Sequence, residues 1–235
     1  MSNTFLTAEW RHLVMLNYAV DRKLLEPLVP SGLELDTFRS LNYVSVVGFL
    51  FLRTRIFGIA FPFHRDFEEV NLRFYVRHRA ADGWRRGVVF VQELVPRRAI
   101  AALARAIYGE PYSACPMSHS IAEQNGELQL RYEWQRNGRT EFLSATVAGE
   151  PTLAAPGSIE EFITEHYWGY NGRCTQYQVE HLRWRVWRAT ATHFNAEVRS
   201  LYGAGFVEPL SAPPASAFVA EGSPIVVRRG SALSL

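Results

Sequence analysis

The chain has 235 residues, of which 48% are hydrophobic and 20% are charged, as is usual for a folded globular protein. This composition excludes a disordered chain, and a net charge of +2 is too small to indicate a nucleic-acid or membrane partner by long-range attraction. No long Pro-, Gly- and Ser-rich stretch occurs before residue 209, so we expect a single domain over residues 1–235.

The N-terminal segment has no basic leader followed by an apolar core, so it does not predict a secretory signal. The longest apolar run, Val44 to Leu52, is about half as long as a membrane-spanning helix and suits a buried strand. Cys115 and Cys174 have no neighbouring Cys or His, which is typical of reduced thiols, and the sequence leaves a disulfide between them open. We therefore expect a cytoplasmic protein without a membrane segment.

The first predicted helix is short. It follows Asp21, a residue type that caps helix N-termini, and has Leu24, Leu25 and Leu28 on one face, while Pro27 and Pro30 keep it short. Alternating or continuous apolar runs then predict strands over residues 43–52, 67–77 and 87–95.

A second predicted helix covers residues 100–107, where apolar residues recur at helical spacing and Gly109 is placed to end it. Two hairpins follow, because Asn125-Gly126 and Asn137-Gly138 are typical of type I′ turns between strands. Ser158 and Glu161 form a capping box, which predicts a third helix starting near residue 159, and residues 174–187 alternate like a strand.

These elements predict an α+β protein with a mostly antiparallel sheet and two or three flanking helices. Curling so many strands into a β-barrel would remove their exposed edges.

The predicted strand over residues 67–77 carries the most informative pattern. Val70, Leu72, Phe74 and Val76 alternate along one face, while Glu69, Asn71, Arg73 and Tyr75 alternate along the other. The apolar face needs a core. The polar face either points to water, as is common in antiparallel sheets, or lines a cleft or barrel interior.

If the polar face points inward, it supplies the side chains of a binding site. Arg73 would bind a carboxylate with two parallel hydrogen bonds, and Asn71 would offer both a donor and an acceptor. A negatively charged Glu69 would neutralise Arg73 in the absence of a ligand. Glu93, on the adjoining strand, would transfer protons if an apolar pocket raised its pKa, and otherwise is a strand-end charge near a helix N-terminus.

The sequence gives little support for metal, nucleotide, cofactor or nucleic-acid binding. None of the seven histidines lie at a metal-ligand spacing, so no metal site is predicted, and no nucleotide-binding or cofactor motif occurs. The stretch "HLRWRVWRAT" interleaves arginine with tryptophan, as nucleic-acid surfaces do, but an alternating strand explains it equally well and the small net charge favours that explanation.

Several longer segments resemble the DUF2071, or YqjF-like, family of uncharacterised bacterial proteins. They are "LNYAVDRKLLEPLVPSGLELD", "FEEVNLRFYV", "GVVFVQEL", "ARAIYGEPY", "FITEHYWGYNGR" and "PPASAFVAEGSPIVV". The segment "HLRWRVW" departs from the family's His-x-Pro-Trp pattern.

This family is similar to the acetoacetate decarboxylase-like superfamily, which implies a cone-like, mostly antiparallel β-barrel with an internal pocket. The resemblance favours an inward-facing Glu69, Asn71 and Arg73. The decarboxylases carry a Schiff-base lysine after a Gly-x-Pro turn; here Gly109-Glu110-Pro111 is followed by Tyr112, and the chain's single lysine is Lys23. The resemblance therefore implies the barrel without Schiff-base decarboxylation.

Two hypotheses remain. In the first, the barrel binds an organic acid or carbonyl compound: Arg73 orients it, Asn71 and Tyr75 hold its pose, Tyr112 lines the pocket, and Glu93 or Glu69 is the candidate general base of lyase, isomerase or hydrolase chemistry without a cofactor. In the second, the barrel is a non-catalytic structural or protein-interaction module, which the missing lysine favours.

Overall fold

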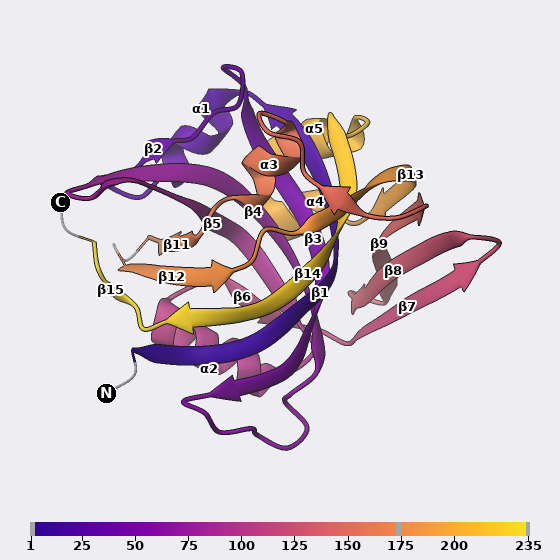
Figure 1. The fold of residues 1–235 in the computed structure, drawn as a ribbon, viewed down its shortest axis with the longest axis horizontal. Coiled ribbons are helices and arrows are strands. Elements are labelled where there is room, and N and C mark those ends of the chain that lie inside the picture. The colour runs from indigo at the N-terminus through magenta and orange to yellow at the C-terminus, as the bar shows by residue number, and fades with distance from the viewer. Residues whose placement is uncertain (1–2, 173–174, 234–235) are drawn as a thin grey trace.

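The computed structural model describes residues 3–172 and 175–233. Seven of its strands close into a barrel, in which each strand is hydrogen-bonded to the next and the last pairs with the first. In spatial order they are β12 (Thr175–His181), β11 (Trp168–Asn171), β5 (Gly83–Val95), β4 (Phe67–Ala80), β3 (Asn42–Ile56), β1 (Thr4–Val20) and β14 (Ser216–Arg228). Every pairing in the ring is antiparallel except that of β5 with β11. The predicted mostly antiparallel barrel is confirmed (Figure 1).

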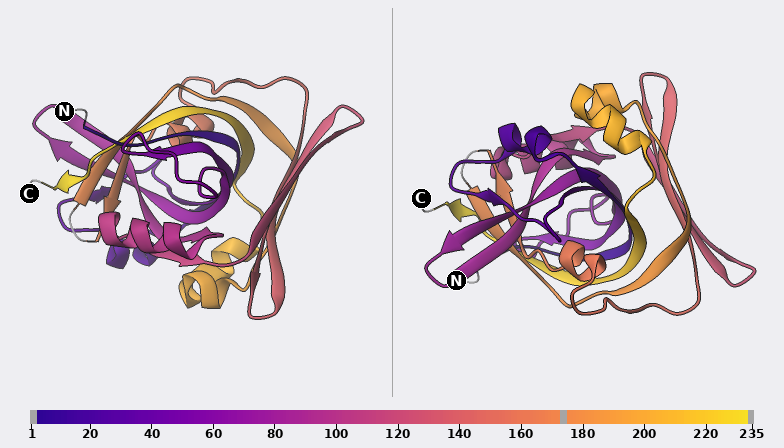
Figure 2. Two further views of the ribbon diagram at one scale, coloured as in Figure 1. Left: turned by 90° about the horizontal axis from the view of Figure 1, so that it is seen from below. Right: turned by 90° about the horizontal axis from the view of Figure 1, so that it is seen from above.

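A second layer of strands leaves the barrel along β14. It contains β13 (Arg185–Asn195), β9 (Arg139–Ala148), β8 (Glu127–Arg136) and β7 (Met117–Gln124), and it lies against one side of the barrel wall (Figure 2). Four short strands pair at the edges: β2 (Glu34–Leu35), β6 (Tyr112–Ala114), β10 (Thr152–Leu153) and β15 (Ser231–Ala232).

The described residues form five short helices rather than the expected two or three. They are α1 (Arg22–Leu25), α2 (Arg98–Tyr108), α3 (Ile159–Thr164), α4 (Val198–Tyr202) and α5 (Val207–Ser211), with 3₁₀ turns at Glu26–Leu28 and Ala204–Phe206. The last two helices have about one turn each, which is too short for apolar periodicity to reveal them.

The predicted helix caps and turns are confirmed. Asp21 accepts a hydrogen bond from the Lys23 amide at 2.8 Å, and Ser158 Oγ accepts one from the Glu161 amide at 3.2 Å. Gly109 ends α2 with a φ of 68°, in the left-handed region where glycine carries no steric penalty. Both Asn-Gly pairs have positive φ at each residue, as a type I′ turn requires.

Two apolar cores lie on the two sides of the barrel wall. The outer core joins the apolar face of β4 to the second layer, where Tyr132, Trp134 and Leu143 are fully buried. The inner core fills much of the barrel interior with aromatic and aliphatic side chains, Phe49, Phe51 and Phe67 among them. The apolar residues of β4 therefore point out of the barrel, and its polar residues point in.

The two ends of the barrel are covered differently. At one end, α3 places Phe162 against Tyr75 and His166, with ring centroids 5.4 and 5.0 Å apart. At the other end lie α2 and the connection between β3 and β4, residues 57–66, which hangs below the barrel in Figure 1 and runs across the ring of strands in the view from below (Figure 2).

Two further points concern the described part of the chain. It contains no helix long and apolar enough to cross a membrane. Cys115 is buried with a free thiol, and Cys174 lies outside the described residues.

Candidate functional site

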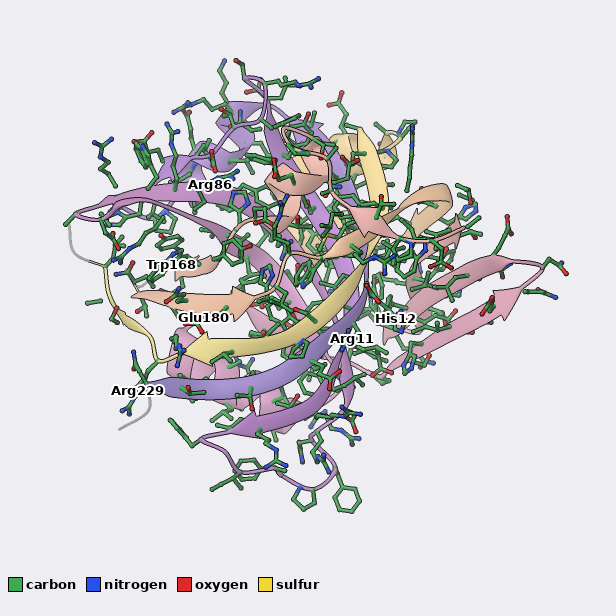
Figure 3. All side chains as sticks on the ribbon, in the orientation of Figure 1. Arg11, His12, Arg86, Trp168, Glu180 and Arg229 are labelled. Atoms are coloured by element: carbon green, nitrogen blue, oxygen red, sulfur yellow. The ribbon has the colours of Figure 1, made fainter. Side chains whose placement is uncertain are left out.

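A cavity of about 120 Å³ lies inside the barrel. On this measure about 10–15 Å³ holds one water molecule, so the space suits a small organic molecule on the order of ten water-sized groups. Apolar and aromatic side chains make most of the wall, and β11, on which Figure 3 labels Trp168, contributes the residues Trp168 and Gly169 to it. The polar side chains that reach it are Glu69, Asn71, Arg73, Glu93, Glu110, Tyr112, His166 and Tyr177.

The inward face of β4 supplies three of these groups. Glu69, Asn71 and Arg73 alternate with outward apolar residues, and they are only 3%, 1% and 8% exposed. Their polar atoms are thus removed from bulk water and must find partners in the protein or in a ligand.

Glu93 reaches the same cavity because of a β-bulge. Leu72 pairs with Gln92 and the next residue, Arg73, pairs with Phe90, so β5 has one extra residue here. The extra residue reverses the alternation, and Glu93 points to the same side as Phe90 instead of the opposite one. Glu93 lies directly across from Asn71.

The Gly109-Glu110-Pro111 turn brings two more groups inward. Glu110 follows the end of α2 and is 4% exposed, and its Oε1 accepts a hydrogen bond from the Tyr177 hydroxyl at 2.5 Å. Tyr112, on β6, donates its hydroxyl hydrogen to Glu69 Oε2 at 3.1 Å. Tyr112, just after this turn, thus lines the cavity with a phenol.

Gly169 on β11 makes room for the Tyr177 ring. The two residues face each other across the β11–β12 pair, and a Cβ at residue 169 would lie 2.1 Å from Tyr177 Cζ. No side chain larger than hydrogen fits there unless the ring moves away from Glu110.

The three cavity carboxyls are held toward their neutral form. Burial raises the pKa of Glu69 to about 7, against hydrogen bonds from Asn71 and Tyr112 that lower it. Burial, partly offset by the Tyr177 hydrogen bond, raises the pKa of Glu110 to about 8. The pKa of Glu93 is raised well above its usual range, first by burial and then by repulsion from Glu110 and Glu69, and the nearby Tyr112 hydroxyl only partly opposes this.

Arg73 has no acidic partner in the cavity. Within residues 3–172 and 175–233, no carboxylate oxygen lies within 4.0 Å of its guanidinium nitrogens, and Nε has no hydrogen-bond acceptor. The expected neutralisation of Arg73 by Glu69 does not take the form of a direct ion pair among the described residues, although the charge of Arg73 still lowers the pKa of Glu69. Four residues along a strand span about 13 Å, and Asn71 lies between the two and donates to Glu69 Oε1 at 2.9 Å.

His166 forms a buried pair at the closed end of the cavity. Its Nε2 is 3.1 Å from Asp36 Oδ2, which also accepts from Arg86 Nε at 2.6 Å. Burial lowers the pKa of His166 to about 4, so the ring is neutral. Burial would raise the pKa of Asp36, but the hydrogen bonds from His166 and Arg86 outweigh it and keep the carboxylate ionised. A neutral ring that donates from Nε2 has an acceptor lone pair at Nδ1, and Nδ1 has no partner in the part of the chain that the structure describes.

Tyr75 belongs to the polar face of β4 but does not line the cavity. Its hydroxyl lies 2.5 Å from Ser45 Oγ, and its ring packs on Phe162 and His166. The expectation that Tyr75 holds a ligand's pose does not agree with this placement, because the strand has by then reached the covered end of the barrel.

Sequence reasoning missed four polar groups of this region: Asp36, Glu110, His166 and Tyr177. Glu110 alone had a signal, since it is the middle residue of the Gly-x-Pro turn. The others come from segments whose spacing predicts no chemistry. Among the described residues, no three His, Cys, Asp or Glu side chains are arranged to hold a metal ion.

Comparison with known proteins identifies the family. A model of the DUF2071 family, described as an uncharacterized conserved protein, matches residues 7–224. The chain belongs to the DUF2071 family. One relative is the uncharacterized protein YqjF of Bacillus subtilis, which is 27% identical over 189 residues. The aligned part covers 77% of this chain and 75% of YqjF.

Solved structures place this DUF2071 chain in the acetoacetate decarboxylase-like fold. The acetoacetate decarboxylase of Legionella pneumophila matches with a TM-score of 0.68 at 13% identity, covering 100% of this chain and 90% of that one. The enduracididine biosynthesis enzyme MppR, in complex with a condensation product of pyruvate, matches with a TM-score of 0.71 at 13% identity over 100% and 91%. An acetoacetate decarboxylase-like enzyme of Sphingomonas wittichii RW1 matches with a TM-score of 0.66 at 14% identity over 100% and 94%.

Proposed function

We propose that the barrel binds a small organic acid, with the ligand's carboxylate on Arg73. The observation that carries this proposal is a buried guanidinium that faces an apolar cavity without a carboxylate partner among the described residues. An unpaired buried charge is costly to the protein, by several kcal/mol in order of magnitude, and such a cost is retained where a ligand removes it.

The surrounding carboxyls support an anionic ligand. The pKa of Glu93 is raised toward the protonated form; with pKa values of about 8 and about 7, Glu110 is mainly protonated at neutral pH and Glu69 is partly so. Protonated carboxyls donate hydrogen bonds and do not repel an anion. The cavity therefore combines the positive charge of Arg73 with carboxyl groups that are largely uncharged and can donate hydrogen bonds.

A second polar group on the ligand would also find partners. Among the described residues, Asn71 Oδ1 and His166 Nδ1 have no hydrogen-bond partner, and Glu93 is met only by the nearby Tyr112 hydroxyl. A carbonyl oxygen beside the carboxylate would accept a hydrogen bond from a protonated Glu93. A hydroxyl in that place would also donate a hydrogen bond to Asn71 Oδ1 or His166 Nδ1. MppR, which shares the fold, has been solved with pyruvate, an acid of this kind.

If the bound acid reacts, the reaction would proceed by proton transfer and not through an imine. Lys23 is exposed on α1, away from the cavity, and Tyr112 cannot condense with a ketone. Glu93 is better suited to donate a proton to a carbonyl oxygen than to act as the general base expected from sequence, because its raised pKa keeps it protonated. Glu69, with a pKa of about 7, suits both directions of transfer.

The alternative, a non-catalytic interaction barrel, predicts a polar interior closed by mutual ion pairs. The remaining cavity of about 120 Å³ and the unpaired Arg73 favour ligand binding over it. A cytoplasmic location and the absence of nucleic-acid and membrane partners stay predictions from the sequence.

Titration calorimetry and thermal shift with acetate, pyruvate, acetoacetate and longer carboxylates test the proposal. We expect one or more acids to bind the wild type and to raise its melting temperature. Arg73→Gln should lose this binding without a lower melting temperature of its own, since it removes an uncompensated charge. Arg188→Gln, an exposed arginine on β13, is the matched control and should bind as the wild type does. Equal binding by Arg73→Gln and the wild type, or no binding of any acid, would overturn the proposal.

A further inference from the structure

An apolar groove of about 210 Å³ lies at the lower end of the barrel, between α2 and the connection of β3 to β4. Apart from Thr54 and His64, its walls are hydrocarbon or aromatic side chains, which include Phe61 on the connection and Leu103 on α2. These two side chains are 48% and 40% exposed. The connection also exposes Phe57, Ile59 and Phe63, so apolar surface concentrates at this point of the molecule.

The groove adjoins the cavity. Leu6, Ile56, Phe67, Ile100 and Leu103 line both spaces. Phe67 is the first residue of β4, and its ring stacks on that of Phe51 with centroids 4.8 Å apart, which forms a flat aromatic wall where the two spaces meet.

Along β4, the side chains that line the groove and the cavity change from apolar to charged. The inward residues run from Phe67 at the groove through Glu69 and Asn71 to Arg73 at the far end, about 20 Å away along the strand. The charge therefore lies deep, and between the aromatic wall and the outside the lining is apolar apart from Thr54 and His64. A short acid such as acetate would occupy only the charged end.

We propose that the ligand is an amphipathic monocarboxylic acid, whose carboxylate lies on Arg73 and whose apolar tail passes the Phe51–Phe67 wall into the groove between α2 and residues 57–66. This inference rests on the proposed function and specifies its ligand class. The tail covers Phe61 and Leu103, which are otherwise in contact with water.

Calorimetry with unbranched carboxylates from butanoate to hexadecanoate, below their micellar concentrations, tests the chain-length dependence. Affinity for the wild type should rise by about threefold to fourfold for each added methylene that enters the groove, the value for a fully buried CH₂. Phe61→Gln, whose side chain lines the groove but not the cavity, should bind butanoate as the wild type does, and both Phe61→Gln and Leu103→Gln should lose most of the gain for tetradecanoate and hexadecanoate. Leu182→Gln, a 71% exposed leucine outside the groove, should change neither.

The outcomes separate the two levels of the proposal. If short acids bind in an Arg73-dependent way and affinity does not rise with length, the amphipathic ligand class is wrong and the proposed function stands. If affinity rises with length but the groove variants keep the whole rise, the tail lies elsewhere and the inference is equally wrong. If no acid of any length binds the wild type, the proposed function and this inference both fail.

Discussion

The two faces of β4 are equally buried and chemically opposite. Outward, Leu72 and Phe74 are completely buried in a core shared with the second layer of strands. Inward, Asn71 and Arg73 are almost as deeply buried, yet each has a polar atom without a partner among residues 3–172 and 175–233. Burial alone thus does not distinguish a stabilising face from a functional one; hydrogen-bond satisfaction does.

The outer face of the barrel wall therefore stabilises the folded state, and the buried ionisable groups of its inner face destabilise it. Each pKa unit by which a cavity carboxyl is raised costs the folded state about 1.4 kcal/mol at a pH where the unfolded chain is ionised. Substitutions on the outer face should therefore destabilise, and those that neutralise the inner face should stabilise.

The largest effect is expected on the outer face. Phe74→Ala should lower the free energy of unfolding by about 3–5 kcal/mol, because it leaves a cavity in a core where this ring is fully buried. Urea unfolding measures it. Phe63→Ala, at an 84% exposed ring, is the matched control and should change stability by less than about 0.5 kcal/mol. A loss below about 1 kcal/mol for Phe74→Ala would contradict a packed outer core.

Glu110→Gln should stabilise the protein at pH 8, by roughly 2–4 kcal/mol. The pKa of Glu110 is raised to about 8 in the folded state, so its stabilising contribution is complete below the unfolded value near 4.5 and is lost as pH rises toward 8. Glutamine keeps an acceptor for Tyr177 and removes this loss, and the difference from the wild type should vanish near pH 4. Melting temperatures across pH measure it, with Glu208→Gln as the exposed control; a gain that does not depend on pH would refute the ionisation argument.

Gly169→Ala should cost about 1–3 kcal/mol, because its methyl group would overlap the Tyr177 ring. The ring must then move from Glu110, so the apparent pKa of that carboxyl should rise further. Gly172→Ala has open space around its Cβ and no positive φ, and should be nearly neutral. Thermal unfolding of both variants, with infrared detection of the Glu110 carboxyl, checks this; equal stability of the two would show that the ring is not held as described.

The smallest effect concerns ligand affinity and pH. A bound carboxylate is ionised throughout, but Glu69 and Glu110 lose protons as pH rises through about 7 and about 8 and then repel it. Affinity should fall by about fivefold between pH 6 and pH 9, equivalent to about 1 kcal/mol of repulsion. Glu69→Gln should flatten the profile, as calorimetry at several pH values would reveal. An affinity that increases with pH would contradict neutral carboxyls in the cavity.

Local chemistry made much of the fold predictable. Asp21, Ser158 and the two Asn-Gly pairs act through their own backbone neighbours, so their caps and turns could be read without the tertiary structure. The alternation of residues 69–76 likewise predicts two distinct faces. Glu110 was passed over because its role depends on which way a turn projects, and His166 because its partner Asp36 is 130 residues away in the chain.

By itself the sequence determined that β4 has one apolar and one polar face, that the chain has a single lysine, and that the family is DUF2071. Only the tertiary structure decided that the polar face is the inner one, that a bulge in β5 turns Glu93 toward it, and that Arg73 has no carboxylate within reach. The physical reason is that alternation is a local property of a strand. Which face is enclosed depends on what packs against the other, and here a second layer of strands buries the outside of the barrel wall.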